Sequence, residues 1–383
     1  MRLPIYLDNN STTRVDARVI DAMLPYYHEH YGNAASKTHG FGWRAESAVD
    51  EARGRIAALI GAQPRDIIFT SGATEANNLA LLGAARSSSA KQRHVVSVAT
   101  EHKSVLDPLR ELEKSGYSVT YLRTDRDGRV NAQQVTDALL PETLLVSVML
   151  ANNEIGTVQP IGEIGAVTRA RGVLLHCDAA QATGKVAIDV EAMRIDLCAL
   201  SAHKIYGPKG VGVLYARQLA PRVRLAPIIF GGGHERGYRS GTLNVPHIVG
   251  FGVACALAVE AERTGELKRI EALTRRLRDG ARDEIPDTVL NGPEGERLPG
   301  NLNLSFPGVE SSALLLAMPE LAVSSGSACT SASPEPSHVL RGIGLSAGLM
   351  HSSLRFGIGR FNTLDEIEYT LEKLRRTVLR LRR

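Results

Sequence analysis

The chain has 383 residues, enough for one large and one smaller domain, and 43% of them are hydrophobic, which is sufficient for an extensive core. The charged fraction of 22% and the formal net charge of +4 are ordinary values, which argue against a dedicated nucleic-acid-binding protein. Four widely spaced cysteines without a Cys-x-x-Cys pair fit neither a disulfide framework nor a zinc site, and they favour a reducing cytoplasm.

Short apolar runs alternate with helical patterns through the first part of the chain. A short strand and turn over residues 6–13 is followed by helices over 16–30 and 42–61. Strand-like runs then recur at residues 66–70, 94–98, 119–122, 144–149, 173–177, 195–200 and 211–215. Nearly continuous apolar strands that alternate with helices indicate a mainly parallel sheet covered on both faces. We therefore predict an α/β fold.

The last third of the chain alternates more loosely between strand and helix. The pattern predicts one long helix over residues 246–281, a strand over 301–306 and a final helix that opens with a capping box at Thr363–Glu366. We expect the change from the large domain to a smaller α+β domain within the long helix, near Glu260.

Polar clusters follow several of the predicted strands. They are Thr100-Glu101-His102, Asn152-Asn153-Glu154, Asp178–Gln181 and Ser201–Lys204. Ligands of open α/β sheets bind at the carboxyl ends of the strands, so we expect these clusters to form one site. Ser71-Gly72-Ala73-Thr74, between a strand and a helix, provides free N–H groups for a phosphate, although the same pattern also suits an ordinary helix cap.

Lys204 lies on a tight connection between two apolar strands, and Asp178 ends the preceding strand, 26 residues earlier. A lysine close to a core strand is costly unless it is paired, neutral or covalently used, although its stem can also lie over apolar surface with the amine in water. Pyridoxal phosphate requires such a pair, because an aspartate keeps its pyridinium nitrogen protonated and a lysine forms the Schiff base.

Three segments carry a resemblance to a known family: residues 176–181 (HCDAAQ), 201–204 (SAHK) and 324–331 (SSGSACTS). They resemble the cofactor site and the sulfur-carrying loop of the cysteine desulfurases of the nitrogenase-maturation and housekeeping iron–sulfur branch. The resemblance runs from Tyr6 to about Arg360. It implies a fold-type I pyridoxal phosphate enzyme of the class V aminotransferase superfamily. The large domain, residues 15–259, would contain a mainly parallel sheet of the seven-stranded type, and residues 1–14 and 260–383 would form a small domain that carries Cys329.

The resemblance also implies roles for individual residues toward pyridoxal 5'-phosphate. Asp178 would pair with the pyridine nitrogen, Gln181 would contact the ring hydroxyl, and His102 would stack on the ring and move protons. The expected phosphate ligands are Ala73, Thr74, Ser201 and His203, together with the partner subunit's Thr242. Thr242 thus implies a homodimer with shared active sites.

The same resemblance implies L-cysteine as the substrate. Arg355 would clamp its carboxylate, as a bidentate guanidinium suits that planar group, with help from Asn33 and Asn153. The alternative interpretation is that Arg355, an arginine near a strand, takes part in a structural ion pair. Lys204, once displaced by cysteine, would move the Cα proton.

Cys329 lies among Ser, Gly, Ala and Thr, which offer it no apolar packing and favour an exposed, reactive thiol. The expected reaction converts L-cysteine to L-alanine, with a persulfide formed on Cys329 and its sulfur passed to an acceptor protein for iron–sulfur cluster assembly or tRNA thiolation. Alternatives are a selenocysteine lyase, another class V aminotransferase-like enzyme, or a non-enzymatic sulfur-relay subunit, which the presence of both Lys204 and Asp178 disfavours.

No apolar run approaches the roughly 20 residues that span a bilayer, and the first residues lack a signal pattern. We therefore expect a soluble, cytoplasmic protein without membrane or direct nucleic-acid partners and without a metal site.

Overall fold

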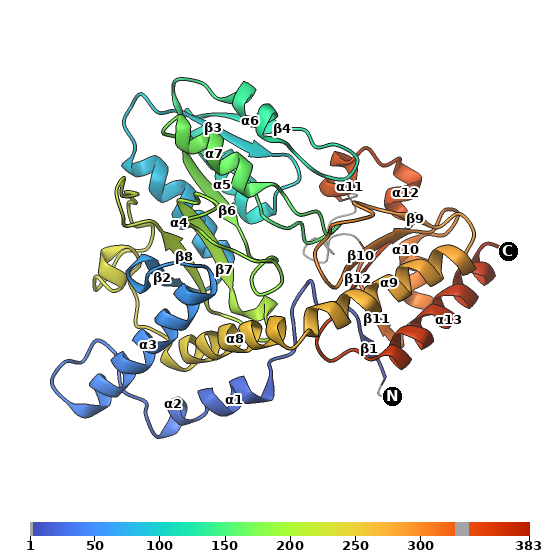
Figure 1. The fold of residues 1–383 in the computed structure, drawn as a ribbon, viewed down its shortest axis with the longest axis horizontal. Coiled ribbons are helices and arrows are strands. Elements are labelled where there is room, and N and C mark those ends of the chain that lie inside the picture. The colour runs from blue at the N-terminus through green and yellow to red at the C-terminus, as the bar shows by residue number, and fades with distance from the viewer. Residues whose placement is uncertain (1–2, 326–336) are drawn as a thin grey trace.

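The computed structural model describes residues 3–325 and 337–383, and it has two lobes of unequal size (Figure 1). The larger lobe is built on a seven-stranded sheet. The smaller lobe contains both ends of the described chain and is built on a three-stranded sheet. The α/β class predicted from the sequence is confirmed.

The large sheet has the strand order β2-β8-β7-β6-β5-β3-β4. Its strands are β2 (Ile67–Thr70), β3 (His94–Val98), β4 (Ser118–Leu122), β5 (Thr143–Ser147), β6 (Leu174–Asp178), β7 (Leu197–Ser201) and β8 (Gly212–Ala216). The pairs from β7 to β4 are parallel, whereas β8 runs antiparallel to both β7 and β2. Because β2 therefore points the same way as β7, six of the seven strands end at one edge of the sheet.

Helices cover both faces of this sheet, as expected for buried apolar strands. Helices α4 (Ala73–Ser87) and α5 (Lys103–Lys114) pack on one face, where Leu79 and Leu109 belong to the same hydrophobic core as Leu214 of β8. Helices α3 (Gly40–Leu59), α7 (Ile161–Ala170) and α8 (Val245–Arg263) pack on the other, in the hydrophobic core that contains Phe251 and Val213. The adjacent residues of β8 thus face separate cores, as the two-residue period of a strand requires. The remaining helices of this lobe are α1 (Ala17–Met23), α2 (Pro25–His28) and α6 (Ala132–Ala138).

The smaller lobe has its own hydrophobic core. Its sheet has the order β12-β10-β9, and a separate parallel pair joins β1 to β11. Its elements are β1 (Ile5–Tyr6), α9 (Glu266–Glu284), β9 (Val289–Leu290), β10 (Asn301–Ser305), α10 (Ser311–Ala317), β11 (Leu321–Ala322), α11 (His338–Gly342), α12 (Ala347–His351), β12 (Ser353–Gly357) and α13 (Leu364–Leu381). The N-terminal Ile5 and Leu7 pack in this core with Leu302 and Phe356. This supports the proposal that residues 1–14 and 260–383 form a domain distinct from residues 15–259.

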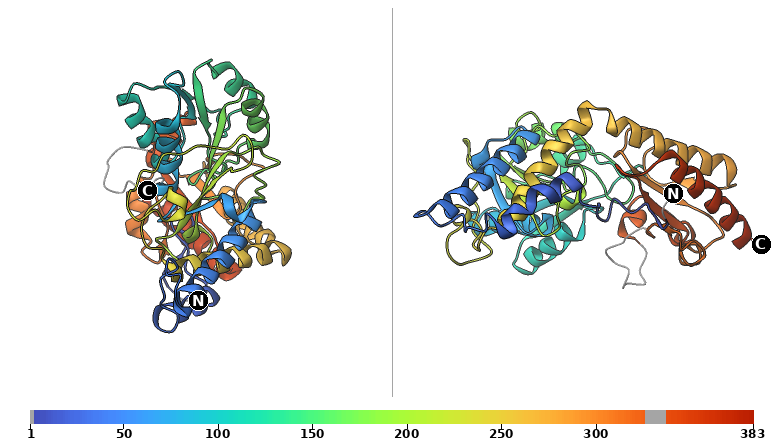
Figure 2. Two further views of the ribbon diagram at one scale, coloured as in Figure 1. Left: turned by 90° about the vertical axis from the view of Figure 1, so that its left-hand side faces the viewer. Right: turned by 90° about the horizontal axis from the view of Figure 1, so that it is seen from below.

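The prediction of a single long helix over residues 246–281 is wrong, because two helices occupy this stretch. Helix α8 ends with Thr264 as its C-cap, and α9 begins after Gly265, which has a left-handed φ of 77°. Glycine adopts this conformation without a Cβ penalty, so the chain can change direction there. Figure 2 shows α8 and α9 following each other from the larger lobe to the smaller one.

Helix α8 is long and apolar enough, by length and composition, to cross a membrane. It packs against α3 and α1, however, and Phe251, Ala254 and Cys255 are fully buried in the core. We therefore interpret α8 as a core helix.

Candidate active site

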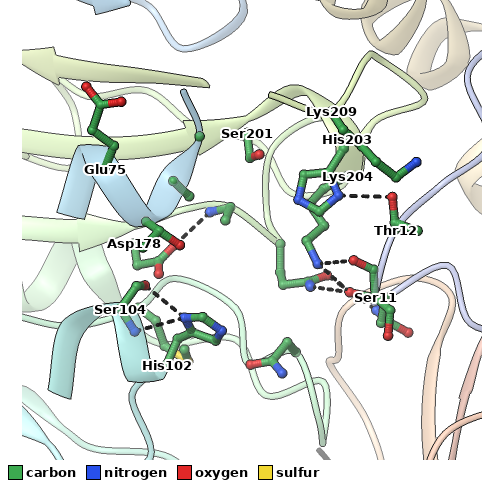
Figure 3. A pocket seen from close by; sticks show the side chains of 18 of the residues that line it. Ser11, Thr12, Glu75, His102, Ser104, Asp178, Ser201, His203, Lys204 and Lys209 are labelled. Carbon is green, nitrogen blue, oxygen red and sulfur yellow. Dashed lines mark hydrogen bonds between the residues drawn. The ribbon is translucent and has the colours of Figure 1, made fainter. Parts of the chain in front are cut away.

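A cavity of about 450 Å³ lies at the edge of the large sheet where the parallel strands end (Figure 3). Its walls come from the segments that follow β2, β3, β5, β6 and β7, from the N-terminal residues 10–12 and from β12 of the smaller lobe. The predicted site residues that line it are Ala73, Thr74, His102, Asn153, Asp178, Gln181, Ser201, His203, Lys204 and Arg355. The volume falls within the range of about 300–1,000 Å³ that is usual for ligand pockets.

Lys204 ends a short 3₁₀ turn, Ala202–Lys204, directly after β7. Its Nζ donates to the carbonyl oxygens of Asn10 and Ser11, at 2.7 Å each. The preceding His203 makes a 3.0 Å hydrogen bond between its Nδ1 and Thr12 Oγ1. Burial, together with the positive charges of Lys204, Lys209 and Lys185, lowers the pKa of His203 to about 4. His203 is therefore a neutral hydrogen-bonding group at physiological pH.

Asp178 is the last residue of β6 and is only 6% exposed. Its Oδ1 accepts from the Ala180 N–H at 3.0 Å, and its Oδ2 accepts from Asn77 Nδ2 at 2.8 Å. Both carboxylate oxygens are thus oriented by donors. Figure 3 shows Asp178 and Lys204 beside the same pocket.

His102 caps helix α5, because its Nδ1 accepts from the Ser104 N–H at 3.1 Å. A nitrogen that accepts cannot carry a proton in the neutral ring, so this contact places the proton of neutral His102 on Nε2. The same Nδ1 lies 2.8 Å from Ser104 Oγ, which in turn accepts from Asn77 Nδ2 at 2.8 Å. His102 and Asp178 are therefore linked through Ser104 and Asn77.

Asn77 was missed in the sequence analysis, although it joins most of the polar groups under the site. It is fully buried in α4, and its Oδ1 lies 3.1 Å from Nε2 of His176. His176 Nδ1 lies 2.8 Å from Ser147 Oγ, and burial lowers the pKa of His176 to about 4 despite the nearby Asp178. The available signal was a polar residue among the apolar residues of the helix, since a buried amide requires partners.

The predicted phosphate cradle lies at the start of α4. Gly72 is the N-cap and provides no side-chain acceptor, so the first N–H groups of the helix are open to the pocket. Glu75 lies beside it, accepts from the Ser71 N–H at 2.8 Å and pairs with Arg239 Nε at 2.7 Å. Burial alone would raise the pKa of Glu75, but the hydrogen bonds from Arg239 and Ser71 lower it.

Arg355 reaches the pocket from β12 and is only 2% exposed. Its Nη2 donates to Asp8 Oδ1 at 2.9 Å and to Ser11 Oγ at 2.6 Å, and its Nη1 donates to the Asn153 carbonyl at 3.2 Å. Its Nε is buried and has no hydrogen-bond partner in residues 3–325 and 337–383. Arg355 therefore forms the structural ion pair considered from the sequence and also faces the site.

Three predicted site residues are not among those that line the cavity. Asn33 is exposed and caps its own turn, with its Oδ1 accepting from the Ala35 N–H at 2.9 Å. Thr242 is exposed, three residues after Arg239. Cys329 lies outside the described residues, so its role stays a prediction, as do those of Asn33 and Thr242.

Comparison with known proteins agrees with this fold. The family model described as aminotransferase class-V matches residues 5–370, and the chain belongs to this family. The chain is 56% identical to the cysteine desulfurase IscS of Anaeromyxobacter dehalogenans (strain 2CP-C), over 100% of this chain and 94% of that protein.

Two solved structures extend the comparison. A NifS-like protein superimposes with a TM-score of 0.90 at 36% identity, over 98% of this chain and 99% of the other. SspA in complex with cysteine superimposes with a TM-score of 0.81 at 36% identity, over 94% and 99% of the two chains.

Proposed function

We propose that the protein is a pyridoxal phosphate-dependent cysteine desulfurase. The observation that carries this proposal is the position of Lys204 and Asp178, which follow neighbouring parallel strands and line one cavity. The likeness over the full chain to proteins named cysteine desulfurase supports the choice of reaction within the family.

The residues present fit pyridoxal phosphate. The open start of α4, with Ala73 and Thr74, suits a phosphate, and the Asp178 carboxylate suits a protonated ring nitrogen. Asn10 Oδ1 is buried and has no hydrogen-bond partner in the described part of the chain, which leaves an acceptor for a donor on a bound molecule. Ser201, His203 and Gln181 complete the expected ligands of the cofactor.

When bound, pyridoxal phosphate would supply an electron sink that weakens the Cα–H bond of the substrate and then the bond between Cβ and sulfur. Lys204 would hold the aldehyde carbon of the cofactor covalently and, once displaced, would move the Cα proton with its amine. The Asn10 and Ser11 carbonyls fix the direction of that amine. His102, with its proton on Nε2, lines the same cavity and would donate and accept protons there.

Arg355 would bind the substrate carboxylate, with Asn153 and Asn33 assisting. Cys329 would attack the substrate sulfur as a thiolate. The sulfur–carbon bond breaks, a sulfur–sulfur bond forms on Cys329, and a proton is added to the remaining carbon. L-cysteine and the Cys329 thiol thus give L-alanine and a Cys329 persulfide, which passes its outer sulfur to an acceptor protein of iron–sulfur assembly or tRNA thiolation.

The test is to incubate the purified protein with L-cysteine and a thiol reductant and to measure alanine and sulfide. We expect equal amounts of both products from a yellow protein. Cys329→Ser should lose both products while it keeps the cofactor absorbance, and Lys204→Ala should lose the absorbance maximum of the lysine-bound cofactor. Full activity of Cys329→Ser on cysteine would contradict the persulfide route and favour a lyase, which comparison with selenocysteine would then identify.

We also propose a homodimer in which the partner subunit's Thr242 completes the phosphate site. Support comes from Thr242 being exposed and from large exposed apolar side chains on the same lobe, among them Phe230 (76%), Tyr31 (66%) and Trp43 (57%). Mixing Lys204→Ala with Thr242→Ala chains tests this. If Thr242 acts across the interface, mixed dimers contain one intact site and recover activity that neither variant has alone.

A cytoplasmic location is part of the same proposal. Cys177, Cys198 and Cys255 are free thiols in the described structure, which suits a reducing compartment. Fractionation of the native cells, followed by detection of the protein with an antibody, would test it.

A further inference from the structure

A second cavity, of about 270 Å³, lies in the smaller lobe between α9 and the loop of residues 291–300. It shares none of its lining residues with the candidate active site. Its lining includes three guanidinium groups, from Arg275, Arg278 and Arg297, and two carboxylates, from Glu271 and Glu296. We call it the arginine pocket.

Arg297 carries a charge that is shielded from solvent and accepted only by neutral groups. Its Nη1 donates to the Pro293 carbonyl at 3.1 Å and its Nη2 to the Ile155 carbonyl at 3.0 Å, and both acceptors are neutral. Its Nε is shielded from solvent without a hydrogen-bond partner among the described residues. Within residues 3–325 and 337–383, no carboxylate oxygen lies within 4.0 Å of a guanidinium nitrogen of Arg297, so it forms no salt bridge there. A shielded charge normally requires a counter-ion, so this arrangement is incomplete.

The neighbouring carboxylates are engaged elsewhere or lie in water. Both oxygens of Glu294 accept from Arg282 Nη1, at 2.8 and 3.0 Å. The Glu296 side chain is 86% exposed and lies 3.7 Å from Arg129. Glu271, on the wall of the pocket, is exposed as well. Exposed charges are strongly screened, so these three carboxylates compensate the charge of Arg297 only in part.

Two further guanidinium groups raise the positive charge beside Arg297. Arg278 donates from Nε to Asp279 at 2.7 Å and from Nη1 to the Glu294 carbonyl at 3.1 Å. Arg275 is exposed at the mouth, with no salt bridge or hydrogen bond in the part of the chain that the structure describes. Burial and the charge of Arg278 lower the pKa of Arg297 to about 10, although the charge of Glu294 opposes this effect, and Arg297 is still cationic at neutral pH.

We propose that the arginine pocket binds a small oxyanion, a phosphate- or carboxylate-bearing molecule, between Arg297, Arg278 and Arg275. Guanidinium groups match such planar or tetrahedral oxygen sets through charge-assisted hydrogen bonds. The cavity volume lies just below the usual range of about 300–1,000 Å³, which limits the ligand to a small molecule. Anchoring of the 291–300 loop explains the hydrogen bonds that Nη1 and Nη2 of Arg297 donate. It explains neither the missing counter-ion of Arg297 nor the presence of two additional arginines.

The test is calorimetric titration of the protein, saturated with pyridoxal phosphate so that the cradle at α4 is filled, with inorganic phosphate and separately with succinate. We expect at least one of them to bind with a Kd below about 1 mM. The double variant Arg275→Ala/Arg278→Ala should bind at least about tenfold more weakly. Arg276→Ala is the matched control, because Arg276 lies on the same helix but pairs with Glu368, at 2.7 Å.

Equal affinity of the wild type and the double variant would overturn the proposal, since the anion would then be bound elsewhere. Absence of binding of both probes to the wild type would overturn it as well. Circular dichroism of the two variants shows whether each is folded. Arg297→Lys, which keeps a cation but loses the fork, provides a second test and should weaken binding while the loop contacts are partly preserved.

Discussion

Nδ2 of Asn77 lies 2.8 Å from Asp178 Oδ2 and 2.8 Å from Ser104 Oγ, so one buried amide orients both the carboxylate and the residue that supports His102. Asn77 comes from α4, Asp178 from β6 and Ser104 from α5. Asp178 and His102, the two groups proposed to act on the cofactor, therefore have a common support that is fully buried and does not line the cavity.

Asn77→Ala should remove this support without removing a proposed catalytic group. It leaves Asp178, Ser104 and His176 each without one partner, and an unsatisfied buried group costs about 1–3 kcal/mol. We expect a lower free energy of unfolding and a cofactor absorbance whose pH dependence changes, because Asp178 is less firmly oriented. Denaturation and spectroscopic pH titration measure the two effects. Asn78→Ala is the control, since Asn78 donates only to the Thr74 carbonyl of its own helix; an identical spectrum for Asn77→Ala and the wild type would contradict the assignment.

Replacing each partner of the Arg355–Asp8 pair separates the two possible roles of this arginine. If Arg355 clamps the substrate carboxylate, Arg355→Lys should raise KM for cysteine by about tenfold or more, because the bidentate fork is lost. Asp8→Asn keeps the guanidinium in place through Ser11 and Asn153 and should change KM much less. Steady-state kinetics on both variants, with cofactor content checked by absorbance, distinguishes the two roles of Arg355. Equal effects of the two substitutions would show that Arg355 serves only as a structural ion pair.

Much of the sheet and many of the residues that line the cavity could be predicted because they depend on local pattern. Apolar strands, and the polar residues that follow them, placed His102, Asp178 and Lys204 at one edge, since all parallel strands end there. The capping box at Thr363 is likewise a local signal, and it is present in the structure.

Features that depend on tertiary contact could not be predicted in this way. Asn10 and Ser11 accept hydrogen bonds from Lys204, which is more than 190 residues away in the sequence. The side-chain partners of Asn77 lie on two other elements, α5 and β6, between 27 and 101 residues away in the sequence. The break at Gly265 is different, because the polar run Glu262–Glu266 and its glycine are local signals of a helix end, and a single left-handed residue changes the direction of the chain there.

Arg53 and Glu235 form a buried ion pair that supports the loop carrying Thr242. Arg53 Nη1 and Nη2 donate to the two oxygens of Glu235 at 2.9 and 2.8 Å, and Glu235 also accepts from the Phe69 N–H at 2.8 Å. Arg53→Ala leaves Glu235 as a buried charge without its partner, which costs about 3–5 kcal/mol. We expect a corresponding loss in the free energy of unfolding by chemical denaturation. The double variant Arg53→Met/Glu235→Gln removes both charges and should be more stable than Arg53→Ala. If the double variant were less stable, the destabilisation of Arg53→Ala would come from lost packing of the Arg53 side chain and not from the unpaired charge of Glu235.

Glu154 should make the stability of the protein depend on pH. It is buried, and its carboxylate oxygen accepts from Ser337 Oγ at 2.5 Å. Burial raises the pKa of Glu154 from 4.5 to about 7, although Ser337, Arg355 and His102 oppose this effect. The folded state therefore holds the proton more tightly than the unfolded state. This contribution to stability is complete below pH 4.5 and is lost as the pH rises to 7. It amounts to about 3 kcal/mol, since a pKa difference of one corresponds to about 1.4 kcal/mol.

Glu154→Gln cannot ionise and retains an acceptor for Ser337. Its unfolding free energy relative to the wild type should therefore increase between pH 5 and pH 7 and level off above. Parallel profiles of the two proteins, measured by urea denaturation across this range, would show that Glu154 does not titrate in the folded state.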